Sequence, residues 1–440
     1  MMSNGATSLI NNIMSFFHSS KRGLKRHRNI IKSIGALFAG NLSVSILGAL
    51  GGLLVARFVG PEVNGQFRIF TIPLMYLTFL QLGTFQGIQR QIPYYTGLGN
   101  PDQVEKIASV AGAWNIGVAT LISIVFVGFT FWELLQYNWG AAAGWFSQAI
   151  FCWSVYYGGY LGNTFRTVNN FVTVARIQLI QSVLAFIFVF AVPFFQLYGL
   201  CLKASIPSII CVWLYHRNRP LRMPLKFDFT VFMEVLKIGA PLCFWQSLNT
   251  SLWLAAESTL MLYFGGVKAL GLFSVAIVYR ESVSVLPQAI FQVLKPRIAE
   301  TYGRLGHMGR NLQHYSLIAA VLSVFMILVV WLVSYLLDYF VPNFIPKYID
   351  GIQLMKICSL VAVIHAASLP LNGLFATGKG WLFGKGILAG LLVFPLAVYL
   401  LVPIIGGMLA VAVGSLIGNA VWIAVGYIDV VKLIRQDSSL

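Results

Sequence analysis

The chain has 440 residues, of which 58% are hydrophobic and only 10% are charged, and its mean hydropathy is +0.79. A soluble domain carries about 25% charged residues, so these values exclude a soluble globular protein of this length. The net charge of +17 would favour nucleic acid as a partner of a soluble protein. In a membrane protein, however, basic residues collect in the cytoplasmic loops. The composition therefore predicts an integral membrane protein that contacts membrane lipids and no nucleic acid.

Apolar stretches follow one another along the whole chain, separated by short connections. Each crossing of a bilayer needs about 20 apolar residues, so we expect an all-α integral membrane fold with about twelve transmembrane helices. The first six are predicted at 34–57, 69–89, 107–131, 142–164, 168–192 and 195–214. The second six are predicted at 236–263, 269–294, 315–340, 351–375, 381–403 and 406–431.

The longest polar stretch divides the two sets of helices and defines the organisation of the chain. We predict a basic cytoplasmic segment, an N-lobe, a basic cytoplasmic linker, a C-lobe and a cytoplasmic tail, at 1–33, 34–214, 215–230, 231–432 and 433–440. With the amino terminus inside, nearly all lysines and arginines between the spans fall on the cytoplasmic side. The exceptions, on the outer side, are Arg57, Arg68, Lys268 and Lys347. Both termini are therefore predicted to be cytoplasmic.

The two halves also resemble each other in sequence. The segment 58–67 aligns with 264–273, and the same offset pairs Thr78 with Ser284 and Phe85 with Phe291. An even number of crossings in each half means that both halves enter the membrane in the same direction. This predicts a parallel internal repeat about an axis along the membrane normal, and transporters built in this way bind substrate between their halves. We therefore expect two six-helix lobes around a central cavity.

Polar residues within the spans are the candidates to line that cavity, because a lipid-facing charge costs about 2.5–3.5 kcal/mol. Four polar residues recur once per helical turn in the span 269–294, and a glutamate adjoins the first of them. These residues are Arg280, Ser284, Gln288 and Gln292, with Glu281 beside Arg280. Other polar residues within spans are Gln246, Asn249, Thr250 and Glu257 in 236–263, and Lys203 in 195–214.

Two interpretations of these residues remain open. In the first, they line a cationic, hydrophilic cavity that admits an anionic head group. In the second, they form a hydrogen-bond network between helices, in which Glu257 or Glu281 neutralises Arg280. Lys203 is equally compatible with a cavity and with snorkelling of its long side chain to the membrane surface.

A lone histidine, His365, lies inside the span 351–375. In the first interpretation, His365 packs between helices and its ring nitrogens are hydrogen-bonded. A proton or sodium gradient would suit a transporter as its energy source, and His365, Glu257 and Glu281 are then the candidate coupling groups. The sequence has no nucleotide-binding loop, no metalloprotease motif and no hydrolase nucleophile motif. No catalytic residue, metal or cofactor is therefore expected.

The segment Ala56-Arg57-Phe58-Val59-Gly60-Pro61-Glu62-Val63-Asn64-Gly65 resembles the pattern that follows the first helix of the polysaccharide-biosynthesis exporters. These include the O-antigen and lipid-linked oligosaccharide flippases of the multidrug/oligosaccharidyl-lipid/polysaccharide exporter superfamily. Only a leucine of that pattern differs, where this chain has Val59. Weaker matching segments lie at 81–83, 270–276, 295–300 and 405–410. The resemblance therefore covers most of the chain, although each segment alone is weak.

The resemblance implies two six-helix lobes that alternate in access between the two sides of a bacterial inner membrane. The implied partner is an undecaprenyl-diphosphate-linked glycan, moved to the periplasmic leaflet for O-antigen, capsule or exopolysaccharide assembly, with other polysaccharide-assembly proteins as further partners. Charged residues in the central cavity are typical functional positions in such exporters. On this criterion, and not on a strict motif, the resemblance implies functional roles for Arg280, Glu281, Glu257 and Lys203. Two alternatives stay open: a multidrug or small-cation exporter of the same superfamily, and a membrane glycan polymerase or ligase.

Overall fold

The computed structural model describes residues 40, 42–221, 224–305, 309–371, 374 and 380–438. All regular secondary structure in this part of the chain is helical, which confirms the predicted all-α class. The first half contains the helix Leu42–Phe58, α2 (Pro61–Leu77), η1 (Thr78–Gln81), α3 (Thr84–Gly97), α4 (Pro101–Leu135), α5 (Trp139–Trp153), η2 (Ser154–Gly158), α6 (Gly159–Thr167), α7 (Phe171–Ile187), η3 (Phe188–Ala191), α8 (Val192–Phe195) and α9 (Leu197–Arg217). The second contains α10 (Phe229–Ser247), η4 (Leu248–Leu252), α11 (Trp253–Leu305), α12 (Gly309–Phe344), η5 (Pro346–Gly351), α13 (Ile352–Ala367), α15 (Gly380–Ile405) and α16 (Gly407–Ser438).

These helices account for the predicted membrane spans. Among the described residues, nine stretches are long and apolar enough to cross a bilayer. One of them, Phe229–Gln288, contains two crossings, because Gly266 adopts a left-handed φ of 78° and turns the chain. The short apolar helix Leu42–Phe58 and the segment from α5 to α6 supply the others that the sequence predicts. The protein is thus a multi-pass membrane protein. The predicted segment 1–33 lies outside the described residues.

Local sequence signals fix where the helices begin. Pro61 and Pro101 occupy first helical positions, where a missing backbone N–H costs nothing. The side chain of Asn100 accepts a hydrogen bond from the backbone of α4, and the Asp228 carboxylate caps α10 in the same way. Gly406, at a φ of 79°, makes the tight turn between α15 and α16. These caps keep the connections short.

One predicted boundary was wrong. The span expected at 69–89 begins earlier, at Pro61, so Arg68 lies within α2 and not in an outer loop. The sequence carried the signal for this, because a proline at the first helical position with Glu62 in the first turn is typical of a helix start. The earlier helix start matters because it places the Arg68 guanidinium within a membrane span.

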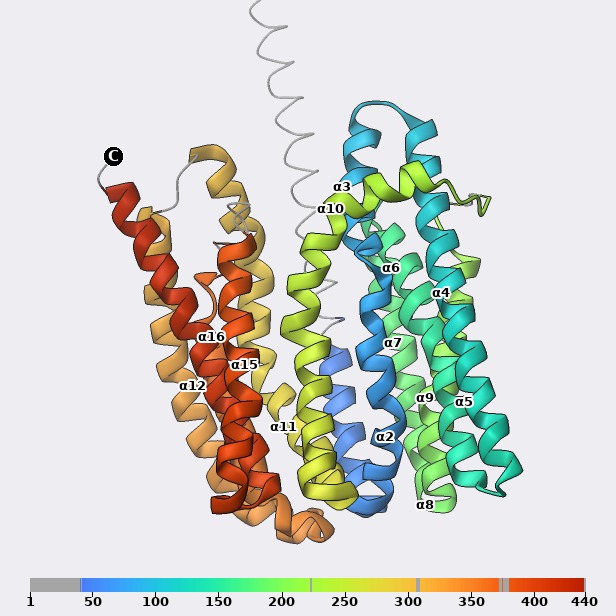
Figure 1. The fold of residues 1–440 in the computed structure, drawn as a ribbon, viewed down its shortest axis with the longest axis vertical. Helices are drawn as coiled ribbons and strands as arrows, with labels where there is room; N and C mark the ends of the chain where they lie inside the picture. The colour runs from blue at the N-terminus through green and yellow to red at the C-terminus, as the bar shows by residue number, and fades with distance from the viewer. Residues whose placement is uncertain are drawn as a thin grey trace, which may run out of the picture.

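The helices form two bundles that approach each other at one end and spread at the other (Figure 1). One bundle holds α2 to α9, and the second holds α12, α15 and α16, with α10 and α11 between them. We call the end with the turns at Gly60 and Gly266 the junction end. The end with the α3–α4 turn and the carboxyl terminus is the spread end. The predicted two-lobe arrangement is confirmed.

The repeat is visible in the packing at the junction end. A Cβ on Gly65 of α2 would lie 2.0 Å from the Val267 carbonyl oxygen, and a Cβ on Gly271 of α11 would lie 1.7 Å from the Pro61 carbonyl oxygen. In the alignment of the two halves, Gly65 matches Gly271 and Pro61 matches Val267. The two contacts are therefore the same contact made twice, as a two-fold axis between the lobes requires. Only glycine permits this approach of backbones.

Polar contacts between the lobes reinforce the junction end. The Asn64 side-chain amide donates to Ser274 Oγ at 2.7 Å and to Tyr348 Oη at 3.3 Å. The Arg57 guanidinium lies 4.6 Å from the centroid of the Phe344 ring. Lys347 Nζ donates to the carbonyl oxygen of Phe58 at 3.3 Å. The end of the first helix and the start of α2 therefore hold the two lobes together.

The start of the predicted C-lobe packs on the N-lobe. Val231, Phe232 and Val235 of α10 belong to the hydrophobic core that α3, α4, α6, α7 and α9 build. The backbones of Gly83 and Gly239 are close enough that a Cβ on Gly239 would lie 1.9 Å from the Gly83 carbonyl oxygen. Toward its other end, α10 reaches the C-lobe, where the Trp245 and Trp381 rings are 5.6 Å apart. Helix α10 therefore bridges the lobes. It is followed by the π-helical turn η4.

Candidate functional site

A buried ion pair lies within the membrane-spanning part of the C-lobe. Arg280 Nη1 donates to both carboxylate oxygens of Glu257, at 3.0 and 3.1 Å. The two residues belong to the two arms of α11, which the turn at Gly266 brings back to back. Glu257 is 1% exposed and Arg280 is 8% exposed. Each charge needs the other, because an isolated charge in such surroundings would be strongly destabilising.

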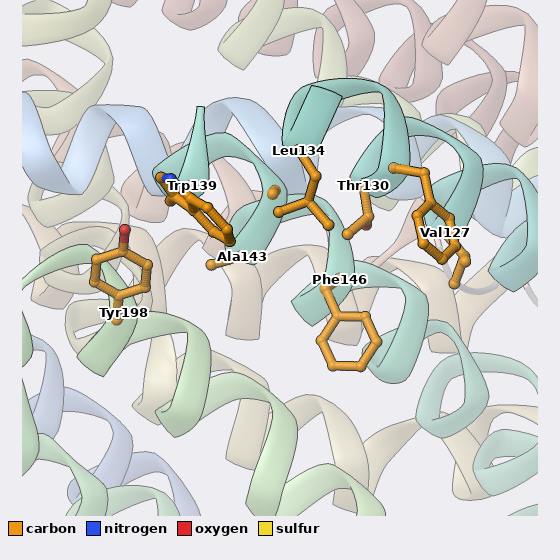
Figure 2. Close-up of a pocket in the computed structure, with 9 residues that line it drawn as sticks. Val127, Thr130, Leu134, Trp139, Ala143, Phe146 and Tyr198 are labelled. Carbon is orange, nitrogen blue, oxygen red and sulfur yellow. The ribbon is translucent and has the colours of Figure 1, made fainter. Parts of the chain in front are cut away.

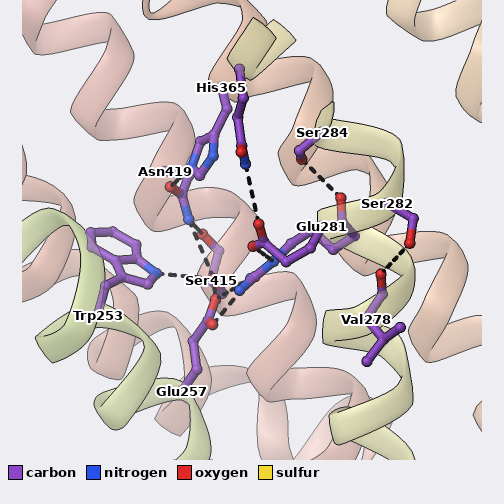
Figure 3. Close-up of polar contacts among 11 residues, drawn as sticks. Trp253, Glu257, Val278, Glu281, Ser282, Ser284, His365, Ser415 and Asn419 are labelled. Carbon is purple, nitrogen blue, oxygen red and sulfur yellow. Dashed lines mark hydrogen bonds and ion pairs between the residues drawn. The ribbon is translucent and has the colours of Figure 1, made fainter. Parts of the chain in front are cut away.

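Helix α16 completes the surroundings of Glu257. Ser415 donates a short hydrogen bond to Glu257 Oε1, and Trp253 Nε1 donates to Ser415 Oγ at 3.3 Å. Asn419 Nδ2 donates to the backbone and side-chain oxygens of Ser415, at 2.9 and 3.3 Å. Figure 3 shows these side chains converging from separate helices. Ser415 and Asn419 were not predicted as site residues, although their one-turn spacing within an apolar span was a usable signal.

The predicted histidine joins the same network. His365 Nε2 lies 3.1 Å from Asn419 Oδ1, and the His365 ring packs edge-on against Trp422 with centroids 5.8 Å apart. The ring is half-buried. A continuous series of hydrogen bonds therefore runs from His365 through Asn419 and Ser415 to Glu257. This satisfied, packed histidine matches the first interpretation made from the sequence.

Glu281, Gln288 and Ser284 lie beside the ion pair with different exposures. The Glu281 side chain is 56% exposed, its Oε1 lies 3.8 Å from Arg280 Nε, and its Oε2 accepts from Gln288 at 3.2 Å. Ser284 is buried, and its hydroxyl donates to the Arg280 carbonyl oxygen within the same helix at 2.8 Å. The fourth member of the predicted stripe, Gln292, has a side chain outside the described part of the structure. The observed Glu257–Arg280 pairing is the one that the network interpretation anticipated.

A second arginine within electrostatic reach of this network belongs to the N-lobe. Arg68 on α2 interacts electrostatically with both Arg280 and Glu257. Its Nε is buried without a hydrogen-bond partner, and its side chain forms no hydrogen bond or ion pair with any described residue. Arg68 also lines a pocket of about 280 Å³ together with Thr71, Gln148 and Ala204. The site therefore has two guanidinium groups, one from each lobe, and one fully buried carboxylate.

The remaining predicted residues lie outside this hydrogen-bond network. Lys203 is half-buried on α9 of the N-lobe and has no hydrogen bond or ion pair with a described residue. Gln246, on α10, accepts a hydrogen bond from Gln86 of α3 at 3.0 Å. Asn249 is half-buried in the π-helical turn η4. Gln246 thus belongs to a contact between α10 and the N-lobe.

A pocket of a different kind lies in the N-lobe, away from this chemistry. It has a volume of about 560 Å³ and lies between α4, α5 and the start of α9 (Figure 2). Its lining is mostly apolar, and Phe131, Trp139 and Phe146 are more than half exposed. Such side chains on the outside of a transmembrane bundle face lipid. Nothing in this groove resembles a site for a polar ligand.

No group of three or more potential metal ligands occurs within the described ranges. The arrangement of Glu257, Arg280 and Arg68 therefore offers charge and hydrogen bonding. The chemistry that it supports is reversible binding of an ion or a charged group. Both lobes contribute to it.

Comparisons with known proteins give a fold but no close relative. No family model matches the sequence, and no curated protein sequence matches it. Solved structures do match: an inward-facing multidrug resistance MATE family transporter of the MOP superfamily has a TM-score of 0.70 and 14% identity, over 89% of this chain and 95% of that chain. The MATE multidrug transporter DinF-BH has a TM-score of 0.66 and 18% identity, over 90% of this chain and 94% of that chain.

A third similar structure is a MOP superfamily transporter from Pyrococcus furiosus, with a TM-score of 0.58 and 13% identity over 92% of this chain and 96% of that chain. Its description states that a reverse polarity of the binding pocket suggests a different function. At these identities the likeness establishes the fold. This chain therefore has the fold of MOP-superfamily transporters along nearly its full length.

Proposed function

We propose that this protein is a flippase that moves an undecaprenyl-diphosphate-linked oligosaccharide across the bacterial inner membrane for surface polysaccharide assembly. The observation that carries the proposal is the charge of the site. Arg68 and Arg280 approach from opposite lobes, and Glu257 is the one fully buried carboxylate among the described residues nearby. Arginine is well suited to diphosphate because its planar guanidinium binds phosphate oxygens in pairs.

The unpartnered state of Arg68 supports a ligand of opposite charge. A charged side chain at the centre of a membrane helix costs about 2.5–3.5 kcal/mol, and Arg280 is already paired with Glu257. An anionic head group that entered between the lobes would supply the missing counter-charge. The lipid tail would remain in the bilayer, so only the polar part of the substrate would enter the protein.

The packing between the lobes supports alternating access. The first-helix connection, α2, α11 and η5 hold the lobes together at the junction end, and the ribbons spread at the opposite end (Figure 1). The predicted orientation places the spread end in the cytoplasm, where a lipid-linked substrate is made. Release then requires the Asn64 and Gly65 contacts to open while the spread end closes. A proton exchanged within the Glu257–His365 network is the coupling event that we propose for this step.

The test is a depletion of the gene followed by a leaflet-resolved assay of lipid-linked glycan. Wild-type protein should restore glycan in the periplasmic leaflet, and the Arg280→Ala and Arg68→Gln variants should not, although they reach the membrane. Arg176→Gln is the matched control, because Arg176 is an exposed arginine on α7. Glycan that reaches the periplasmic leaflet normally without this protein, in cells lacking other flippases, would overturn the proposal.

A multidrug exporter is the second candidate, and one observation favours it. The exposed carboxylate of Glu281 lies beside the site, and a similar structure is the MATE multidrug transporter DinF-BH. Efflux of ethidium, a cationic dye, by cells that express the protein would separate the two functions. Efflux that needs Glu281 and not Arg68 would favour the exporter, and efflux absent from wild-type cells would exclude this dye as a substrate.

A further inference from the structure

A second polar pocket lies inside the N-lobe, between η2, α6, α7 and α9. Its volume is about 180 Å³. A water molecule occupies roughly 30 Å³ in the liquid, so about six waters or one small ring would fill the space. Gly158, Gly159 and Gly162 are part of its lining. Neither the central ion pair nor Arg68 takes part in this pocket.

The pocket is lined by side chains that have unused hydrogen-bonding capacity. Ser154, Gln178, Gln181 and Tyr215 all line it, and none makes a side-chain hydrogen bond to another described residue. A polar group buried without a partner costs about 1–3 kcal/mol. These four side chains are not among the fully buried unpartnered groups, but four polar side chains without a protein partner around one small space favour an occupant with several donors and acceptors. They belong to three different helical segments, so no single neighbour could satisfy them all.

The pocket also lies at the end of a row of amide side chains. Gln86 of α3 donates to Gln246 of α10 at 3.0 Å. One turn along α3, Gln89 donates to Asn163 of α6, and Asn163 lines the pocket. Amides from α10, α3, α6 and α7 therefore follow one another from the bridging helix into the N-lobe. Each amide offers both a donor and an acceptor.

The chemistry of the lining discriminates between possible occupants. No carboxylate lines the pocket, which disfavours a cation. The one charged residue is Arg166, which is exposed and whose Nη1 donates to Asn163 Oδ1 at 3.4 Å. Sugar hydroxyls both donate and accept, so they match amides and hydroxyls better than a phosphate does, and the Tyr215 ring can pack against a sugar face. An anionic phospholipid head group, held by Arg166, is the competing occupant.

We propose that this pocket is a subsite for one sugar ring of the transported glycan. The inference rests on the proposed flippase function and adds to it a place for the neutral part of the substrate. The diphosphate and the glycan would then be recognised by different side chains, arginines for the first and amides for the second. Recognition of a sugar by four uncharged groups would make the pocket selective among sugars, because each unmatched hydroxyl leaves a buried group unpaired.

The experiment is binding of simple glycosides to the full-length protein in phosphatidylcholine nanodiscs, where no sugar-based detergent competes. Saturation-transfer NMR is measured with methyl glycosides of glucose, galactose, mannose, N-acetylglucosamine and glucuronic acid. We expect at least one glycoside to bind, with a dissociation constant on the order of 1 mM. The Gln178→Leu/Gln181→Leu variant should weaken this binding about tenfold or more. The matched control is Gln313→Leu, at an exposed glutamine on α12, which should bind as the wild type does.

The outcomes separate this inference from the proposed function. Arg68→Gln should keep glycoside binding while losing transport, because Arg68 does not line the pocket. If no glycoside binds, or if Gln178→Leu/Gln181→Leu binds unchanged, the subsite is overturned and the flippase proposal stands on its own test. Native mass spectrometry tests for the competing occupant, an anionic phospholipid. A phosphatidylglycerol that stays bound to the wild type and is lost from the double variant would assign the pocket to lipid and overturn the sugar subsite.

Discussion

The candidate site residues of the two lobes differ in how many polar partners they have. In the C-lobe, a single hydrogen-bond network joins Glu257, Arg280, Ser415, Asn419 and His365. In the N-lobe, Arg68 and Lys203, and the lining of the pocket at Gln178 and Gln181, have no such partners among the described side chains. The contrast therefore concerns these particular groups, which are linked to one another in the C-lobe and left without partners in the N-lobe.

This difference indicates a division of roles. A satisfied buried network fixes the position of its members, and its removal is felt as lost stability. Groups without partners contribute little to stability, or oppose it, and they are retained where a ligand supplies the partner. We therefore expect substitutions in the C-lobe network to lower stability, and substitution of Arg280 to abolish transport as well. Substitutions of the open groups in the N-lobe should act mainly on binding and transport.

The largest effect expected is that of Glu257→Ala. It leaves Arg280 buried with no partner except the exposed Glu281, 3.8 Å from its Nε, and breaking one side of a buried pair costs about 3–5 kcal/mol. Thermal unfolding of the purified protein in detergent measures the loss. The Glu257→Met/Arg280→Met variant should recover most of it, since no charge is then left buried. A Glu257→Ala protein as stable as wild type would show that Arg280 finds another partner or water.

At the junction end the two lobes make equivalent contacts. We therefore expect equivalent substitutions in the two lobes to lower the free energy of unfolding by similar amounts. Gly65→Ala and Gly271→Ala each place a Cβ within about 2 Å of a backbone carbonyl oxygen of the other lobe. Overpacking of this kind costs about 1–3 kcal/mol. Unfolding measurements should give similar losses for the two variants. Gly48→Ala is the control, because no atom lies within 4 Å of the added Cβ. Strongly unequal losses would show that the two-fold contact is not equivalent in its energetics.

Arg68→Met should change stability in the direction opposite to Glu257→Ala. Arg68 has no ion pair to lose, and part of the roughly 2.5–3.5 kcal/mol cost of a charge in a span is relieved. The free energy of unfolding should stay level or rise by about 1 kcal/mol, since the side chain is half-buried. The same variant should lose transport of lipid-linked glycan in the complementation assay. A clear loss of stability would mean that Arg68 belongs to the structural network after all.

Hydropathy and loop lengths were sufficient to predict the helical class and the number of crossings. The helix starts were harder, because hydropathy falls at Glu62 and Arg68 although α2 already includes them. The two-fold contact between Gly65 and Gly271 required coordinates, even though the repeat itself was visible in the sequence. Hydropathy also gave no sign that α10 would pack on the N-lobe, since its apolar residues suit either bundle.

The sequence singled out candidate site residues that stand out in composition. Arg280 and Glu257 are charges in apolar spans, and the sequence indicated their pairing as one alternative. Ser415 and Asn419 were missed because small polar residues are common in membrane helices and gain meaning only beside Glu257. The pocket at Gln178 and Gln181 was missed for a related reason, since its residues come from segments that only folding brings together.

The smallest effect expected is that of Ser284→Ala, and it tests the polar stripe directly. The Ser284 hydroxyl already donates to the Arg280 carbonyl oxygen of its own helix at 2.8 Å. Such back-bonding slightly destabilises a helix, so the substitution should change the free energy of unfolding by no more than about 0.5 kcal/mol. Transport should also stay near wild type, while Gln288→Ala, which removes a partner of the exposed Glu281, should reduce it more. A severe transport defect in Ser284→Ala would show that the hydroxyl turns toward the substrate, and the C-lobe would then contribute open groups as the N-lobe does.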